Sequence, residues 1–242
     1  MIWIIGGTSE AGQLVRMLKG KIDYLITVAT ETGREFLEGE TNLKIGRRNL
    51  SEMIKLIRDK NITKIVDLSH PYATEVSENA VKAARETECD YLRYTRLQSQ
   101  IENAIVVPSM EACRDYLGAI SGTVFFTTGS NHIGLFQGIR KENRFVFRIL
   151  PSRESLAVCS DHGVSIKDIV AVLGPFSIEM NTAMFKEYGA DYVVMKNSGP
   201  QGGTREKLKA CEMLNITPII VERPEETGFA DLDDLMKELI SG

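Results

Sequence analysis

The fold is decided by the stretch I-W-I-I-G-G-T-S-E-A-G at residues 2–12. Residues 2–5 are apolar and favour β-structure, as in a buried parallel strand. Ala11, Leu14, Val15 and Leu18 then recur at helical spacing. A glycine turn between a strand and a helix lets the backbone approach a phosphate, and the helix start attracts anionic charge. We therefore expect a nucleotide at this turn, with an ordinary tight turn as the alternative because G-x-G-x-x-G is incomplete.

Strand and helix patterns alternate along the rest of the chain. Strands are expected at residues 24–29, 43–45, 65–68, 91–94, 105–107, 124–127, 145–149, 169–173, 192–195 and 218–221. Helical patterns lie between them, and the last one closes the chain near residues 232–239. This alternation predicts an α/β fold with two Rossmann-like lobes, each with a parallel sheet, and a cleft between them.

The pattern lapses into polar residues near residues 97–103, which indicates a boundary between lobes. We expect a nucleotide-binding lobe at residues 1–98 and a second lobe at residues 99–242 that contributes to the substrate and cofactor cleft. A plain loop is the alternative for the polar stretch.

Composition excludes several classes of protein. The chain has 242 residues, of which 43% are hydrophobic and 26% charged, and its net charge of −4 argues against a nucleic-acid partner. The first strand begins at Met1 and no apolar run reaches the ~18 residues of a membrane helix, so we expect a cytoplasmic protein without a membrane partner, as a monomer or small homo-oligomer. Four cysteines without a C-x-x-C pair predict buried thiols and no metal site.

Further predicted strands end in loops suited to ligands, because ligands bind outside the carboxyl ends of parallel strands. The loop D-L-S-H-P-Y-A at residues 67–73 would place Pro71 at the start of a helix and point His70 into the crevice, unless His70 merely hydrogen-bonds the loop. Similar loops follow at residues 127–131 and 173–177. Lys196 precedes a glycine-rich turn into a helix, which is the pattern of an anion site.

Together these stretches resemble the precorrin-6A reductases of cobalamin (vitamin B12) biosynthesis. The resemblance rests on G-G-T-S-E-A at residues 6–11, S-H-P-Y-A at 69–73, L-R-Y at 92–94 with Arg96, T-T-G-S at 127–130, R-I-L-P at 148–151, G-P-F-S at 174–177 with Glu179 and Asn181, and K-N-S-G at 196–199 with Gly202 and Gly203. It implies an NADPH- or NADH-dependent oxidoreductase that reduces precorrin-6A, or its cobalt form, to the corresponding precorrin-6B by hydride transfer. The partner implied is an anionic tetrapyrrole substrate.

The resemblance also implies roles for individual residues. The nucleotide would be bound by Gly6, Gly7, Thr8, Glu10, Ala11, Glu31, Arg34, Ser69, His70 and Pro71. The substrate would be bound by Tyr72, Arg93, Arg96, Thr128, Gly129, Ser130, Arg148, Ser177, Lys196, Ser198, Gly202 and Gly203. His70 would orient the reactants, and no metal is required.

Arginine suits a substrate with many carboxylates because its planar guanidinium binds a carboxylate by two hydrogen bonds. Arg153 and Arg205 are further candidates, and the alternative for each arginine is a solvated surface charge. Members of the family often carry a short S-x-A-G-R turn near the adenosine ribose, which is longer here at residues 27–34. The choice between NADPH and NADH stays open, because Arg34 suits a 2′-phosphate and Glu31 a free 2′-hydroxyl.

Two other functions fit the same patterns. A two-lobed sensor would bind its ligand without turning it over, and a nucleotide-dependent transferase would use the same glycine turn. Oxidation of NAD(P)H on mixing with the substrate distinguishes a reductase from both.

Overall fold

The computed structural model describes residues 1–34, 37, 39–96, 101, 103–222 and 227–241, which form two compact units. The first unit contains Met1–Arg96 together with Glu225–Gly242, and the second contains Leu97–Pro224. The sequence predicted that residues 99–242 form one lobe, and this was wrong for the C-terminal segment. The last helix packs on the first unit, and its amphipathic pattern carries no signal of which sheet it covers.

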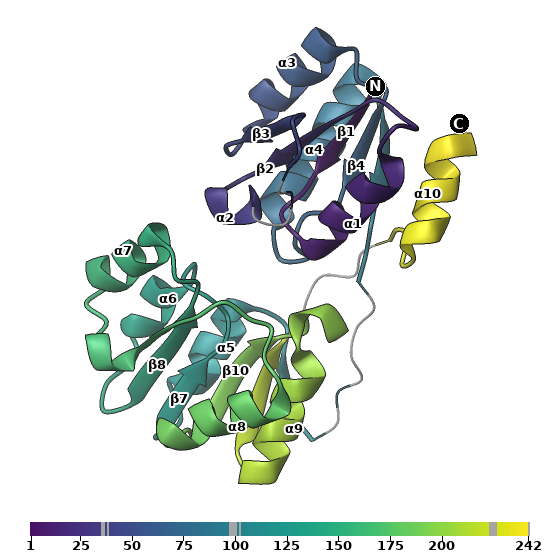
Figure 1. The fold of residues 1–242 in the computed structure, drawn as a ribbon. Helices are drawn as coiled ribbons and strands as arrows, with labels where there is room; N and C mark the ends of the chain where they lie inside the picture. The colour runs from purple at the N-terminus through teal and green to yellow at the C-terminus, as the bar shows by residue number, and fades with distance from the viewer. Residues whose placement is uncertain (35–36, 38, 97–100, 102, 223–226, 242) are drawn as a thin grey trace. The chain divides into compact units, whose positions relative to one another are not determined.

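The first unit is built on a five-stranded parallel sheet with the order β3-β2-β1-β4-β5 (Figure 1). Its elements are β1 (Ile2–Ile5), α1 (Ser9–Leu18), β2 (Tyr24–Val28), α2 (Glu31–Arg34), β3 (Leu43–Ile45), α3 (Leu50–Lys60), β4 (Lys64–Asp67), α4 (Thr74–Thr87), β5 (Asp90–Arg93) and α10 (Leu232–Ser241). The chain leaves β1 to one side of the sheet and later returns to pair β4 with its other side. The strand order therefore reverses between β1 and β4.

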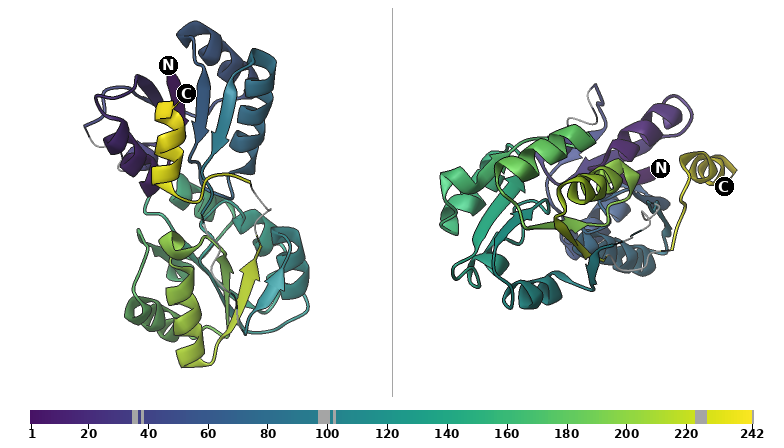
Figure 2. Two further views of the ribbon diagram at one scale, coloured as in Figure 1. Left: turned by 90° about the vertical axis from the view of Figure 1, so that its right-hand side faces the viewer. Right: turned by 90° about the horizontal axis from the view of Figure 1, so that it is seen from below.

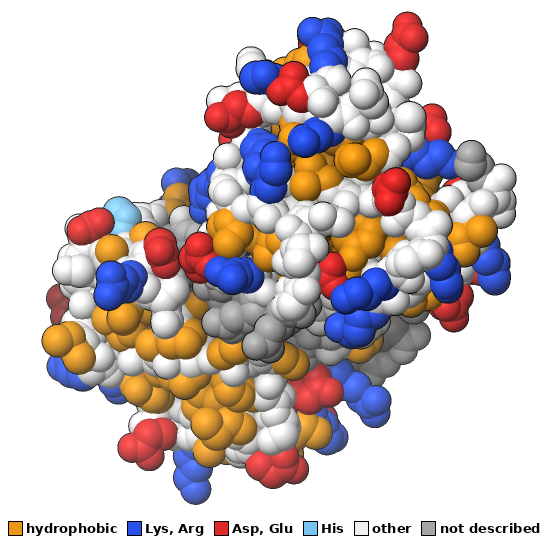
Figure 3. Space-filling view, turned by 45° about the horizontal axis from the view of Figure 1, so that its top comes forward, with side chains coloured by type: hydrophobic (Ala, Val, Ile, Leu, Met, Phe, Trp, Pro, Cys, Tyr) orange, Lys and Arg blue, Asp and Glu red, His pale blue; other side chains and the backbone are white. Residues whose placement is uncertain are grey.

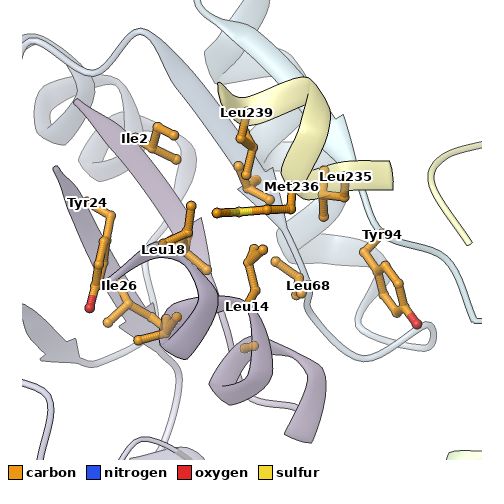
Figure 4. Packing of buried hydrophobic residues seen from close by; sticks show 14 of the residues in the cluster. Ile2, Leu14, Leu18, Tyr24, Ile26, Leu68, Tyr94, Leu235, Met236 and Leu239 are labelled. Atoms are coloured by element: carbon orange, nitrogen blue, oxygen red, sulfur yellow. The ribbon is translucent and has the colours of Figure 1, made fainter. Parts of the chain in front are cut away.

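Alternate residues of each strand fill two different cores. Ile4 and Ile26 face α1 and α10, whereas Trp3 and Ile65 face α3 and α4. Figure 4 shows the first of these cores, where side chains from α1, α10 and the central strands meet. Strand β1 has four consecutive apolar residues because both of its faces are buried.

The C-terminal segment rejoins the first unit through the sheet as well as through α10. Phe229 forms a parallel bridge with Tyr94, and its amide donates to the carbonyl of Arg93 at 2.8 Å. A Cβ on Gly228 would collide with that same carbonyl, so this approach requires glycine. Helix α10 then packs beside α1, as the left view of Figure 2 shows.

The second unit has a six-stranded parallel sheet with the order β6-β11-β10-β7-β8-β9. Its elements are β6 (Ile105–Val107), α5 (Met110–Leu117), β7 (Thr123–Phe126), α6 (Ile133–Gln137), β8 (Arg144–Ile149), α7 (Arg153–Asp161), η2 (Ile166–Asp168), β9 (Ile169–Ala171), α8 (Ile178–Glu187), β10 (Tyr192–Lys196), η3 (Pro200–Gly202), α9 (Thr204–Leu214) and β11 (Thr217–Val221). Its strand order reverses between β7 and β10, which are hydrogen-bonded neighbours.

This second sheet is also covered on both faces. Phe126 and Val194 lie in a core shared with α5, α6 and α7. Phe125 and Met195 lie in the opposite core, shared with α8 and α9. The predicted α/β class with two parallel sheets is confirmed, and so are the predicted strands to within a few residues at their ends.

One predicted helix start differs from the structure. Pro71 does not begin α4, because residues 70–73 form a turn in which the amide of Ala73 donates to the carbonyl of His70 at 2.7 Å. Helix α4 begins at Thr74.

Among the described residues, no helix is long and apolar enough to cross a membrane. On the face in Figure 3, Lys and Arg side chains and Asp and Glu side chains are scattered over the surface, with hydrophobic side chains between them.

Candidate active site

The first candidate site lies where the strand order of the first unit reverses. The Gly6-Gly7 turn follows β1, and Leu68 and Ser69 follow its neighbour β4. The Thr8 hydroxyl joins the two loops by donating to the carbonyl of Leu68 at 2.9 Å. Ligands of open parallel sheets bind at such a reversal point, outside the carboxyl ends of the strands.

The backbone of the glycine turn is shaped for an anion. Gly7 has a φ of 122°, which glycine tolerates, and a Cβ built on it meets no atom within 4 Å. Within the described part of the chain, the amides of Gly7 and Thr8 donate to no acceptor. Two free amides ahead of a helix start form a cradle that fits the pyrophosphate of a dinucleotide. Thr8 takes the N-cap position of α1 but makes no side-chain cap, because its hydroxyl is bound to Leu68.

Glu10 and Arg96, predicted to bind ligands, bind each other. Arg96 donates to both oxygens of Glu10, through Nε at 2.6 Å and Nη2 at 2.8 Å, and both residues are buried. Burial raises the pKa of Glu10, but the hydrogen bonds and the charge of Arg96 outweigh it and lower that pKa below its usual range. Ala11 is fully buried, and it lies 3.3 Å from where a Cβ on Gly6 would be, so it supports the turn from beneath.

Asp67 organises the loop after β4. Its fully buried carboxylate forms an ion pair with Arg93 at 2.8 Å and accepts hydrogen bonds from the Ser69 amide, the Ser77 hydroxyl and the Tyr91 hydroxyl. Arg93 also donates to the hydroxyl of Ser69 at 3.0 Å. The predicted ligands Arg93 and Ser69 are thus held in an internal network that fixes the shape of the loop.

His70 stands at the tip of this loop and is exposed. Its Nδ1 accepts a hydrogen bond from the amide of Tyr72 at 3.3 Å, and the two rings lie 5.9 Å apart. Pro71 is buried beneath the loop, whereas Tyr72 is half-buried.

The ends of β2 and β3 form the third part of this edge. Glu31 and Arg34 of α2 lie 3.7 Å apart as an exposed pair. A Cβ on Gly33 would lie 3.6 Å from the Cα of Gly7, so α2 lies directly beside the glycine turn. Sequence reasoning missed Arg47, an exposed residue just beyond β3, and Arg48 beside it. Gly46 continues the ladder by donating to Val28 at 2.9 Å, which brings these arginines to the end of β2.

A second group of predicted residues gathers where the strand order of the second unit reverses. The loop with Thr128, Gly129 and Ser130 follows β7, and Lys196 ends the adjacent strand β10. Ser130 shares a hydrogen bond of 3.2 Å with Ser155. Burial lowers the pKa of Lys196 to about 8. Sequence reasoning missed His132, whose pKa is lowered by burial and by the charge of Lys196.

Several other predicted ligands have structural roles. The Ser177 hydroxyl caps α8 by accepting from the amide of Met180 at 3.3 Å. Ser198 is buried against Gly202, where a Cβ would collide with the Cβ of Ser198. Gly203 has a φ of 65° at the start of α9. Arg153 and Arg205 are exposed.

Arg148 of β8 lies on the face covered by α8 and α9. It donates to Asn181 at 2.8 Å, and its guanidinium lies 5.0 Å from the centre of the Phe176 ring. Burial lowers its pKa to about 10. The charge of Arg148 also acts on Lys207 of α9, a buried lysine that sequence reasoning missed.

Comparison with known proteins identifies the family. The model of the family described as "Precorrin-6x reductase CbiJ/CobK" matches residues 1–239. The chain belongs to the precorrin-6x reductase family. It is 32% identical to a cobalt-precorrin-6A reductase of Priestia megaterium, over all of this chain and 98% of the relative. It is 31% identical to one of Methanothermobacter thermautotrophicus, over 98% of this chain and 82% of the relative.

A solved structure has the same fold. The structure titled "CobK precorrin-6A reductase" aligns with a TM-score of 0.78 at 22% identity, over 99% of this chain and 96% of that one. The family that matches residues 1–239 makes this chain an oxidoreductase, as its sequence predicted, which sets aside the sensor and the transferase. Among the described residues, no group of three or more His, Cys, Asp or Glu side chains is placed to hold a metal ion.

Proposed function

We propose that this member of the precorrin-6x reductase family reduces cobalt-precorrin-6A with NADPH bound at the glycine turn of the first unit. The match of the family model over residues 1–239 carries the reaction class, which is reduction of the precorrin-6A ring. The cobalt form is favoured because both relatives above are named as reductases of that form. The bound nucleotide supplies the hydride and the ring accepts it, so the protein binds, orients and excludes water.

The nucleotide site is supported by the geometry of the turn. The open space at Gly7 and the free amides of Gly7 and Thr8 fit a pyrophosphate. Two internal ion pairs, Glu10 with Arg96 and Asp67 with Arg93, hold the surrounding loops before any ligand binds. A preorganised site loses less conformational entropy on binding, which raises affinity.

The preference for NADPH is supported by charge. Arg34, Arg47 and Arg48 lie at the ends of β2 and β3, where the adenosine ribose of a Rossmann nucleotide is bound. Glu31 is the one acid that pairs with this group among the described residues. Among the described residues of this edge, a 2′-phosphate would meet three arginines and one carboxylate.

His70 is proposed to orient the reactants. The loop network around Asp67 fixes its backbone, and the amide of Tyr72 fixes its ring. Several arginines were predicted to bind the substrate carboxylates. Two of them, Arg93 and Arg96, form ion pairs with buried acidic residues of the protein, so they are not part of this proposal. Arg148 and Lys196 of the second unit carry the remaining proposal for the substrate carboxylates, and the predicted cleft between the lobes stays a prediction.

The direct test mixes the purified protein with cobalt-precorrin-6A and NADPH under anaerobic conditions and follows the loss of nicotinamide absorbance. Parallel reactions replace NADPH by NADH and the substrate by metal-free precorrin-6A. We expect the fastest turnover with NADPH and the cobalt form. A faster reaction with the metal-free ring would contradict the proposed substrate, and no oxidation with either ring would contradict the proposed function.

A further inference from the structure

Lys207 occupies a position that an apolar residue would normally fill. Helix α9 buries Thr204, Lys207, Ala210 and Cys211, which recur at spacings of three and four residues on one face. Ala210 and Cys211 belong to the core between the sheet and helices α8 and α9. Lys207 therefore points into this layer, and only 5% of its surface is exposed.

Three unfavourable effects act on the Lys207 ammonium. Burial removes its hydration, which is costly for a charge without a partner. Arg148 adds a second positive charge nearby, and together they lower the pKa of Lys207 to about 7. The lysine is also four residues from the N-cap of α9, where the helix dipole disfavours a cation.

The surrounding residues compensate this charge only in part. Within the described ranges, Lys207 forms no ion pair or side-chain hydrogen bond. Glu206 favours the charged form of Lys207. In the part of the chain that the structure describes, Glu206 forms no ion pair with Lys207, and its buried Oε2 has no hydrogen-bond partner. Among the described residues, the Arg148 guanidinium meets uncharged groups: it donates to the amide oxygen of Asn181 at 2.8 Å and to the Met184 sulfur at 3.9 Å, and it lies over the ring of Phe176.

The two cations lie near the carboxyl edge of the second sheet, which is where open parallel sheets bind their ligands. Helix α9 follows the loop that leaves the carboxyl end of β10, and Lys207 is in its first turns. Arg148 is the penultimate residue of β8 and points to the same side of the sheet as Val146, toward α8 and α9. A buried lysine and a half-buried arginine at this edge are complementary to an anionic oxygen group.

We propose that Lys207 and Arg148 form an anion-binding site on the α8/α9 side of the second unit. Its ligand is a carboxylate or a phosphate, and the ring substrate and the nucleotide are the two sources of such groups. A ring carboxylate is favoured because the glycine turn of the first unit already provides for the nucleotide phosphates. The inference thus rests on the proposed function for the identity of its ligand.

The decisive variant is Lys207→Met, which keeps the length of the side chain and removes the charge. Its matched control is Lys209→Met on the same helix, where an exposed lysine pairs with Glu212 at 2.7 Å. Equilibrium binding of cobalt-precorrin-6A is measured without nucleotide, from the absorbance of the ring, and binding of NADPH is measured without ring. Thermal unfolding of each variant is recorded in the absence of ligand.

We expect Lys207→Met to bind the ring roughly tenfold more weakly or worse, while NADPH binding and the Lys209→Met control stay unchanged. Its thermal midpoint should rise, because an uncompensated buried charge is lost. A purely structural lysine would give the opposite pattern, with a lower midpoint and unchanged ring affinity. Lys207→Gln serves as a second variant if Lys207→Met does not fold.

The two ligand arms separate the possible results. Weaker NADPH binding with unchanged ring binding would support the anion site and assign it to the nucleotide. Unchanged binding of both ligands would overturn the inference, even if the wild-type protein reduces the ring as proposed. If the wild-type protein does not reduce the ring, the proposed function fails, and the two binding measurements still test the anion site.

Discussion

Glu10 and Arg96 are 86 residues apart in the chain and are joined by two hydrogen bonds of 2.6 and 2.8 Å. Glu10 lies in the first turn of the helix that follows the glycine turn, and Arg96 lies just after β5. The pair therefore joins the start of the proposed nucleotide site to the end of the segment Met1–Arg96, after which the chain enters the second unit. Because both side chains are buried, neither charge has water as an alternative partner.

Arg96→Ala should destabilise the protein. The substitution leaves the Glu10 carboxylate buried without its cation, and breaking such a pair typically costs about 3–5 kcal/mol. Urea unfolding monitored by circular dichroism measures this change, with Arg16→Ala on the exposed side of α1 as the control. A stable Arg96→Ala protein with a raised KM for the ring would show instead that Arg96 binds substrate.

Gly7→Ala should weaken nucleotide binding. No atom lies within 4 Å of the new Cβ, so the fold has room for it, but the φ of 122° strains any residue with a side chain. Relaxing this strain, which costs on the order of 1–3 kcal/mol, would turn the amides away from the pyrophosphate. Titration with NADPH measures the loss. Gly20→Ala, at another positive φ of 74°, should carry comparable strain and leave the affinity unchanged.

Charge at the ends of β2 and β3 should set the choice of nucleotide. Arg47→Ala should weaken NADPH binding by roughly tenfold, the typical effect of one charge-assisted hydrogen bond, and leave NADH binding unchanged. Glu31→Gln should strengthen NADPH binding, since it removes the carboxylate that faces Arg34 at 3.7 Å. Dissociation constants for both nucleotides decide this prediction. If the wild-type protein prefers NADH, Glu31 outweighs the arginines.

His70→Asn should keep part of the activity. An asparagine oxygen can accept the same hydrogen bond from the amide two residues later, so the loop at Tyr72 would keep its shape. A general acid contributes roughly 10²–10⁴-fold to the rate, whereas an orienting residue contributes less. Steady-state kcat and the Kd for nucleotide are measured together. A loss of kcat near the upper end of that range, with unchanged Kd, would make His70 a proton donor.

The stability gained by Lys207→Met should depend on pH. The pKa of Lys207 is lowered to about 7 in the folded protein by burial and by Arg148, against about 10.4 in the unfolded chain. Between these values the unfolded chain binds more protons, so wild-type stability rises with pH by up to about 1.4 kcal/mol per unit. The amount by which the free energy of unfolding of Lys207→Met exceeds that of the wild type should therefore be largest below pH 7 and shrink toward pH 10. Unfolding curves of both proteins across this range measure it, and a constant difference would contradict the lowered pKa.

The sequence predicted what depends on local pattern. Apolar runs bounded by turns marked the strands, and the glycine pair after β1 marked the proposed nucleotide site. Such signals are local. A buried strand requires apolar residues at its own positions, and a positive φ favours glycine at the position that adopts it. The predicted order of strands and helices therefore agrees with the structure almost throughout.

What the sequence left open depends on contacts between distant residues. Arg93 and Arg96 look like surface arginines in the sequence, and only their acidic partners across the fold show that they are buried. Lys207 did carry a local signal, because it interrupts the apolar face of α9. The C-terminal helix had a clear pattern, but an amphipathic face does not specify which of two sheets it covers.

The return of the C-terminal segment to Arg93 determines the order in which the two units can be completed during synthesis. A ribosome makes residues 97–224 before residues 225–242, so every residue of the second unit exists before the first unit has its last helix. Until then, the apolar side chains of α1 and β1 that α10 covers stay without their partner. Exposed apolar surface is what chaperones bind and what drives aggregation. The unit that is started first in this protein is therefore the one that is finished last.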